Sequence, residues 1–219
     1  MSTVEGARQT SFDRADDDLQ WMRRLGTTFA DRLWPVFLLF AGLALFAVLT
    51  NSPGSYIADN RFEQYWSPGA RLLREAFIWD GGRDLGRVRE DFWPGSTAFV
   101  AVLRGLGASP ALAQHLWHAA LLVLGGVGMV VVMRLFRARI GAVHVIAGLF
   151  YMFSPFSAAF LLPSGLYLPY ALAPWLLAAF VHGVRHEQPL RWAAVFALAV
   201  FAAGTSDPPG VAYSLLPLM

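Results

Sequence analysis

The sequence predicts an all-α fold, a polytopic bundle of transmembrane helices embedded in a lipid bilayer. Hydrophobic residues make up 56% of the 219 residues, and the mean hydropathy is +0.47. Charged residues make up only 15%, against roughly a quarter in ordinary soluble proteins. The apolar residues form long continuous blocks, not the spacing of an amphipathic helix or strand, and this pattern is typical of helices that cross a membrane.

Five apolar blocks are predicted to be spans, and a sixth begins near Val211. The five blocks are residues 33–50, 111–136, 141–162, 167–182 and 192–204. The fifth block is short, because 13 residues at ~1.5 Å each cover only about 20 Å of a hydrocarbon core roughly 30 Å thick. Because the sixth block is cut off at Met219, we expect residues 33–219 to be the N-terminal part of a longer membrane domain, or the product of a truncated gene.

The arginines in the short loops predict the orientation of the chain. Residues 1–32 form a polar tail, and the first apolar block starts too late for a cleavable signal peptide. The loops after the second and fourth blocks contain arginines, whereas loops 163–166 and 205–210 contain none. Short loops that carry arginine face the cytoplasm. We therefore expect a plasma-membrane protein with a cytoplasmic N-terminus and with loop 51–110 on the outer face.

The outer loop is predicted to carry two interfacial helices. Residues 68–79 begin with a proline, and their apolar side chains form one face of a helix while the charged ones lie off it. The apolar face holds Leu72, Leu73, Ala76 and Phe77, and the charged residues are Arg71, Arg74 and Glu75. Tryptophans 66, 79 and 93 suit helices that lie along lipid headgroups. Residues 96–106 form a second apolar helix that is too short to span.

Several classes of chemistry are excluded by what the sequence lacks. There is no cysteine, which excludes disulfides, thiolate metal sites and a cysteine nucleophile. The sequence has no P-loop, dinucleotide fingerprint or zinc-protease motif. The net charge of +2 is too small to indicate a nucleic-acid partner. Any transfer chemistry is therefore expected to use a donor other than a nucleotide.

Asp59 and Glu63 are the first candidates for catalysis, because they follow the first span closely. In a helix, positions i and i+4 share one face, so the two carboxylates would lie together. One could remove a proton from an acceptor hydroxyl, or both could hold a divalent cation through oxygen ligands. The alternative is that they are two ordinary acids in a solvated loop. Spacing alone favours that alternative.

Four further charged residues are candidates for substrate binding. Arg61 could bind a lipid-linked phosphate through two hydrogen bonds, or it could be a surface residue paired with Glu63. Glu90 and Asp91 could contribute to an acceptor site, or they could mark the start of a helix. Asp207 follows the fifth span on the outer side and could reach the same cavity, although an Asp-Pro turn explains it at least as well.

His115 and His118 lie at i and i+3 near the outer end of the second span, on one helix face. A two-histidine metal site needs at least one more ligand, and none is visible nearby in the sequence. Packing or hydrogen bonding at the membrane interface is the favoured interpretation. The prolines at 163, 169 and 174 break helical hydrogen bonds, and such breaks favour a protein-lined pocket on the outer side.

An ordered set of motifs resembles the N-terminal membrane domain of the mycobacterial-type α-(1→3)-arabinofuranosyltransferases, which belong to the GT-C class. The set begins with Asp59 and Arg61 and continues with the helix that starts at Pro68. It then includes FWPGSTAF at 92–99, LGASP at 106–110, QHLW at 114–117, YMFSP at 151–155 and LPYALAPW at 168–175. The individual motifs are short, and their common order carries the resemblance.

The resemblance implies a membrane glycosyltransferase with a GT-C-like helical bundle. It would transfer a sugar, expected to be arabinofuranose, from a decaprenyl-phosphate-linked donor to a cell-wall glycan acceptor of arabinan or lipoglycan type. Asp59 matches the position of the catalytic base, while Arg61 and Glu63 stand where relatives have Lys and Asp. The alternatives are a transporter or flippase of a lipid-linked substrate and a non-catalytic membrane subunit. The span interiors lack the ionisable residues that a transporter tends to carry.

Overall fold

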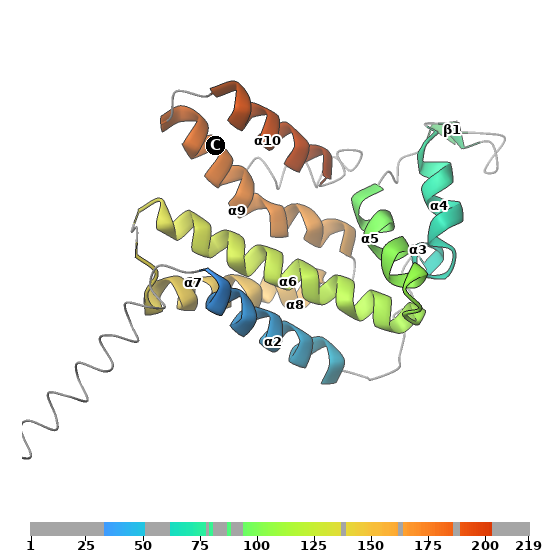
Figure 1. Cartoon of the computed structure of the whole chain (residues 1–219), viewed down its shortest axis with the longest axis horizontal. Coiled ribbons are helices and arrows are strands. Elements are labelled where there is room, and N and C mark those ends of the chain that lie inside the picture. The colour runs from blue at the N-terminus through green and yellow to red at the C-terminus, as the bar shows by residue number, and fades with distance from the viewer. Residues whose placement is uncertain are drawn as a thin grey trace, which may run out of the picture.

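The structure is a computed structural model that describes residues 33–50, 62–77, 79–80, 87–88, 94–136, 139–161, 164–185 and 189–202. Nearly all of these residues are helical (Figure 1). The helices are α2 (Trp34–Thr50), α3 (Phe62–Trp66), α4 (Pro68–Glu75), α5 (Pro94–Gly105), α6 (Pro110–Arg134), α7 (Ala142–Met152), α8 (Pro155–Phe160), α9 (Ser164–Arg185) and α10 (Pro189–Ala202). Two-residue strands, β1 (Trp79–Asp80) and β2 (Arg87–Val88), pair antiparallel. The all-α membrane class is confirmed, and the short hairpin is an addition to it.

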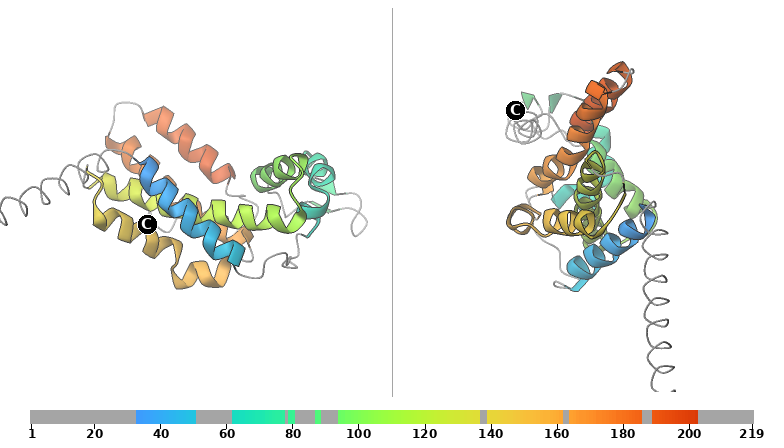
Figure 2. Two further views of the ribbon diagram at one scale, coloured as in Figure 1. Left: turned by 60° about the horizontal axis from the view of Figure 1, so that its bottom comes forward. Right: turned by 90° about the vertical axis from the view of Figure 1, so that its left-hand side faces the viewer.

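Helix α6 is the centre of the molecule. It packs against α2, α7 and α9, and α10 packs on the other side of α9. We call α2, α6, α7, α8 and α9 the helical bundle. Helices α3, α4 and α5 pack together beyond the start of α6, as Figure 1 and the left view of Figure 2 show, and we call them the α3–α5 unit. The loop between the first two spans therefore folds into helices of its own.

The predicted spans correspond to helices whose bounds differ by a few residues. Three helical stretches among the described residues are long and apolar enough to cross a membrane: Pro110–Arg134, Ala142–Ala159 and Tyr167–Arg185. The helices Trp34–Thr50 and Pro189–Phe201 are apolar but shorter. The number of spans stays a prediction, and the sixth span lies outside the described residues.

Glycine allows the closest approach within the bundle. The Phe40 ring of α2 is completely buried where α6 and α7 meet. A Cβ atom on Gly148 of α7 would lie 2.5 Å from Phe40 Cζ, and one on Gly126 of α6 would lie 3.0 Å from Phe40 Cδ2. Small residues let membrane helices approach closely, so that dispersion contacts replace the hydrophobic effect that lipid cannot supply. Sequence periodicity did not identify this three-helix contact.

The prolines of the bundle leave backbone carbonyls without their helical donors, and hydroxyl groups replace those donors. Pro174 has no N–H for the carbonyl of Tyr170, and the Tyr151 hydroxyl donates to that carbonyl at 2.7 Å. Pro155 likewise cannot donate to the carbonyl of Tyr151, which accepts from the Tyr170 hydroxyl at 3.2 Å and from Ser157 Oγ at 3.1 Å. Helix α9 therefore continues through Pro174, contrary to the interruption that the sequence suggested.

Candidate functional site

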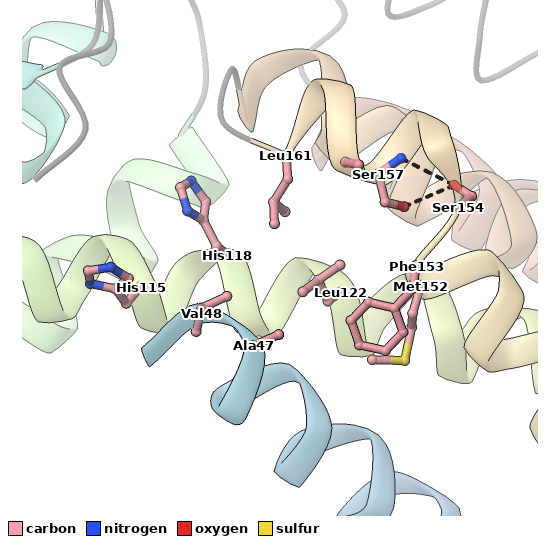
Figure 3. A pocket seen from close by; sticks show the side chains of 11 residues that line it. Ala47, Val48, His115, His118, Leu122, Met152, Phe153, Ser154, Ser157 and Leu161 are labelled. Carbon is pink, nitrogen blue, oxygen red and sulfur yellow. Dashed lines mark hydrogen bonds between the residues drawn. The ribbon is translucent and has the colours of Figure 1, made fainter. Parts of the chain in front are cut away.

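A cavity of about 350 Å³ lies where the end of α2, the first half of α6 and the connection from α7 to α8 meet (Figure 3). Most of its wall is apolar, with Val48, Leu122 and Met152 among the lining residues. Its polar side chains come from two places: His115 and His118 on α6, and Ser154 and Ser157 at the start of α8. We call it the His–Ser cavity.

The start of α6 determines where the two histidines lie. Ser109 accepts a hydrogen bond from the Leu112 amide at 3.2 Å, and Pro110 occupies the first helical position, so the helix begins sharply. His115 Nδ1 lies 2.7 Å from the Ala111 carbonyl oxygen, one turn earlier. Because a carbonyl only accepts, Nδ1 carries the proton, and Nε2 of the neutral ring is left as an acceptor.

His118 is the least satisfied polar group of the cavity. Its side chain is only 3% exposed, and within the described part of the chain its Nε2 atom has no hydrogen-bond partner. A buried polar atom without a partner is unusual in a native structure and calls for an explanation. Since His118 lines the cavity, a group placed in the cavity could supply the missing bond.

The serine side of the cavity is held by a hydroxyl network. Ser154 caps α8 by accepting from the Ser157 amide at 3.1 Å, and Pro155 follows it, as Pro110 follows Ser109. The Ser154 hydroxyl lies 3.1 Å from the Tyr170 hydroxyl, and the Ser157 hydroxyl lies 3.0 Å from that of Tyr167. These bonds orient both serines before any ligand is present. Figure 3 shows the two serines on the opposite side of the view from the two histidines.

The His–Ser cavity offers neutral hydrogen bonding and apolar contact. The residues that line it within the described ranges include no Arg, Lys, Asp or Glu. The same described ranges contain no group of three His, Asp or Glu side chains that could hold a metal ion. The cavity residues by themselves can therefore bind a hydroxylated group, but they cannot neutralise a phosphate.

A second buried polar cluster lies inside the α3–α5 unit. Arg71 Nε donates to Glu75 Oε1 at 2.8 Å, and the Thr97 hydroxyl donates to the same oxygen at 3.0 Å. The side chains of Arg71 and Glu75 are 3% and 1% exposed. The other carboxylate oxygen, Glu75 Oε2, is buried and has no partner among the described residues.

This cluster shows which face of α4 packs against α5. Leu73 and Phe77, on the predicted apolar face of this interfacial helix, are 73% and 68% exposed, whereas Arg71 and Glu75, predicted to lie off that face, face α5. The helix also ends at Glu75, earlier than predicted. A tertiary contact accounts for the orientation of α4: Thr97 on α5 donates to Glu75, so Arg71 and Glu75 face inward while Arg74 stays exposed.

Glu63 is the only predicted site residue within the described ranges. It lies in the first turn of α3, and its carboxylate forms an ion pair with the Arg74 guanidinium on α4. Both side chains are substantially exposed. Asp59, Arg61, Glu90, Asp91 and Asp207 lie outside the described residues, so the proposed sharing of one helix face by Asp59 and Glu63 stays a prediction.

Sequence reasoning singled out the two histidines but missed the two serines that share their cavity. The Ser-Pro pair is a readable signal, because a serine cap followed by proline marks a helix start. It occurs at Ser109-Pro110 and again at Ser154-Pro155. The sequence offered no signal that the second helix start would face the first half of α6.

Comparison with known proteins gives the family. The family profile described as the N-terminal GT-C domain of α-(1→3)-arabinofuranosyltransferase matches residues 43–217. A single-particle cryo-EM structure of an arginine-to-serine mutant of the arabinofuranosyltransferase AftD from Mycobacteria has a TM-score of 0.72 and 24% identity. A second cryo-EM structure of AftD from Mycobacteria has a TM-score of 0.69 and 24% identity. No curated protein matches this sequence.

The two structural matches each cover 85% of this chain, but the chain spans only 15% and 14% of those proteins. At this level of identity they show that the fold is shared. The family profile covers most of the chain, from the middle of α2 to beyond α10. The protein is therefore a membrane protein that belongs to the family of α-(1→3)-arabinofuranosyltransferase N-terminal GT-C domains.

Proposed function

We propose that this chain is the first part of a membrane glycosyltransferase that transfers arabinofuranose from a decaprenyl-phosphate-linked donor to a hydroxyl of a cell-wall glycan, of arabinan or lipoglycan type. The observation that carries the proposal is the match of the family profile to residues 43–217. The reaction is placed on the outer face of the plasma membrane, with the N-terminus in the cytoplasm. The short Arg-bearing loops support this orientation.

Asp59 is proposed as the catalytic base. It would take the proton of the acceptor hydroxyl while the hydroxyl oxygen forms a bond to the anomeric carbon of the donor. The bond from that carbon to the phosphate oxygen breaks, the configuration inverts, and the lipid phosphate leaves. Support comes from sequence order: Asp59 lies between the end of α2, whose Val48 lines the His–Ser cavity, and the start of α3.

The other predicted residues are assigned to binding. Arg61 would bind the donor phosphate by charge-assisted hydrogen bonds. Glu63 would orient substrate or help to hold a divalent cation, and its ion pair with Arg74 makes it a positioning residue. Glu90, Asp91 and Asp207 would contribute to the acceptor side.

The test is a transfer assay on the full-length protein in native membranes. The donor is radiolabelled decaprenyl-phosphate-linked arabinose, and the acceptor is a synthetic arabinan oligosaccharide. We expect Asp59→Asn to reduce turnover by about 10²–10⁴-fold, the usual contribution of a general base. The control is Asp84→Asn, which alters another acid of the same loop that has no assigned role. A parallel assay with EDTA tests the need for a divalent cation.

Three outcomes would contradict parts of the proposal. Near-normal turnover of Asp59→Asn at normal expression would exclude Asp59 as the base. Movement of the labelled lipid across proteoliposome membranes without any transfer product would favour a transporter or flippase. Intact glycan linkages after deletion of the gene would favour a non-catalytic subunit.

A further inference from the structure

We propose that the His–Ser cavity is a binding site for one neutral, hydroxylated ring, and that His118 Nε2 is its direct hydrogen-bond partner. This inference rests on the function proposed above, under which the cavity binds the sugar ring of the substrate and does not bind its phosphate. Neither the family profile nor the structural matches assign any role to this cavity.

The first observation is the unsatisfied histidine. His118 is 3% exposed, and its Nε2 atom is buried without a partner within the described part of the chain. His115, one turn earlier on the same face, already bonds the Ala111 carbonyl. His118 is thus the cavity residue with a buried nitrogen that lacks a partner among the described residues.

The second observation is the set of donors and acceptors around the cavity. His115 Nε2 is an acceptor because Nδ1 carries the proton. The hydroxyls of Ser154 and Ser157 each bond a tyrosine hydroxyl, and a hydroxyl oxygen has two lone pairs and one proton. Ser157 and Tyr170 both donate to the Tyr151 carbonyl. The Ser154 proton therefore goes to Tyr170, and the serines are acceptors toward the cavity. Such a set suits a ligand whose groups donate, and sugar hydroxyls can donate.

The third observation is the absence of charge. The lining residues within the described ranges include no Arg, Lys, Asp or Glu. The described arginine that precedes α6 most closely, Arg104 on α5, donates to the Ala108 carbonyl. The two arginines of α4 are engaged with Glu75 and Glu63. A phosphate buried in the cavity would leave its charge uncompensated, which is strongly unfavourable in a low-dielectric site. The cavity therefore selects a neutral group.

The size of the cavity is sufficient for a single ring. Its volume of about 350 Å³ lies at the small end of ligand pockets, which range over about 300–1,000 Å³. The apolar side chains of Leu122, Met152 and Leu161 provide surfaces for the C–H face of a ring. The hydroxyl network on the serine side is already formed, so little reordering accompanies binding.

The experiment measures binding to the full-length protein in lipid nanodiscs. The neutral probe is tritiated octyl β-D-arabinofuranoside, and octyl phosphate is the charged competitor. We expect His118→Phe to weaken binding of the neutral probe about tenfold or more, since one buried hydrogen bond is lost. His118→Gln, which keeps a donor and an acceptor, recovers part of that loss. Octyl phosphate competes poorly.

The matched control is His182→Gln. His182 stacks on the Trp192 ring at 4.7 Å, away from the cavity, and its replacement leaves probe binding unchanged. Ala47→Leu provides an independent variant, because it adds volume to the cavity wall from α2 without altering either histidine. It is expected to weaken binding by a similar factor.

A measurement on the unaltered protein covers the case in which the variants fail to fold. The ¹⁵N chemical shift of the His118 Nε2 atom, measured by nuclear magnetic resonance on protein labelled with ¹⁵N-histidine, reports a new hydrogen bond to this buried atom. We expect octyl β-D-arabinofuranoside to change this shift, and octyl phosphate to leave it unchanged. Equal changes with both compounds, or with neither, would overturn the assignment. Unaltered binding to a folded His118→Phe protein would do the same.

The design separates this site from the proposed function. Asp59→Asn is expected to bind the probe normally while failing to transfer sugar. If the full-length protein transfers arabinose and His118→Phe leaves its KM unchanged, the site assignment fails and the function stands. If the probe binds in a His118-dependent manner but transfer never occurs, the function fails and the neutral-ring site stands.

Discussion

The α3–α5 unit and the helical bundle bury polar groups in different ways. The unit encloses a full ion pair, Arg71 with Glu75, and leaves apolar side chains such as Leu73 outside. The bundle buries only neutral polar side chains, including His118 and Ser157. Within its five helices, charged residues occur only at the last positions, Arg134 of α6 and Arg185 of α9.

This contrast reflects what surrounds each region. A charge inside a membrane span is costly, whereas hydroxyls and imidazoles can satisfy backbone carbonyls at lower cost. The unit lies beyond the start of α6, and there a buried pair is tolerated because Thr97 adds a second hydrogen bond to Glu75. The exposed side chains of Trp66, Leu73, Phe77 and Trp79 suit the predicted headgroup location. Four substitutions test the contrast, from the largest expected effect to the smallest.

The largest effect is expected for Glu75→Ala. Removing Glu75 leaves the buried Arg71 charge without its carboxylate, and breaking a buried pair in this way costs about 3–5 kcal/mol. Hydrogen–deuterium exchange of peptides covering residues 62–77 in the full-length protein measures the lost free energy of local opening. The double variant Arg71→Met with Glu75→Leu removes both charges and should recover most of the loss. A Glu75→Ala protein with unchanged exchange would show that the pair is not buried.

A smaller effect is expected for Gly148→Ala in the bundle. The added Cβ would lie 2.5 Å from Phe40 Cζ and 2.9 Å from the Gly126 carbonyl oxygen, so α2 and α6 must shift. Overpacking of this kind costs about 1–3 kcal/mol. The thermal midpoint of the detergent-solubilised full-length protein reports the change. Gly42→Ala is the matched control, since nothing lies within 4 Å of its added atom. Equal midpoints for the two variants would contradict the close packing.

The hydroxyl network is tested by Tyr151→Phe. The ring still stacks on Tyr170 at 4.2 Å, but the carbonyl of Tyr170, left without a donor by Pro174, loses its hydrogen bond. A bond of this kind in a membrane protein contributes about 1 kcal/mol. Tyr170→Phe removes the reciprocal bond to the Tyr151 carbonyl and should cost a similar amount. The decrease in thermal midpoint of the double variant should differ from the sum of the two single decreases, because the two residues share one hydrogen-bond network. Strict additivity of the midpoints would argue against the network.

The smallest effect is expected for Glu63→Gln. Its ion pair with Arg74 is exposed, with side-chain exposures of 31% and 47%, and exposed pairs contribute about 0–1 kcal/mol. Exchange of residues 62–77 should change little, in contrast to Glu75→Ala. If Glu63→Gln lowers the free energy of local opening as much as Glu75→Ala does, solvent exposure does not explain the difference between the two ion pairs.

The sequence alone was sufficient for the class, the helices and several of their ends. Long apolar blocks predicted α2, α6, α9 and α10, because a helix is the simplest way to satisfy backbone groups in lipid. Ser109-Pro110 begins α6 where the apolar block was expected to start. The resemblance to the arabinofuranosyltransferase family, drawn from the order of short motifs, was confirmed by the family match over residues 43–217.

The orientation of α4 and the composition of the His–Ser cavity were decided only by tertiary structure. Hydrophobic periodicity predicted the apolar face of α4, but it did not predict that Arg71 and Glu75 would be buried against Thr97 on α5. His118 and Ser157 come from different helices, and no local pattern predicts which helix faces another. Local sequence thus determines where helices begin and end, while contacts between residues distant in the chain determine which of their side chains meet.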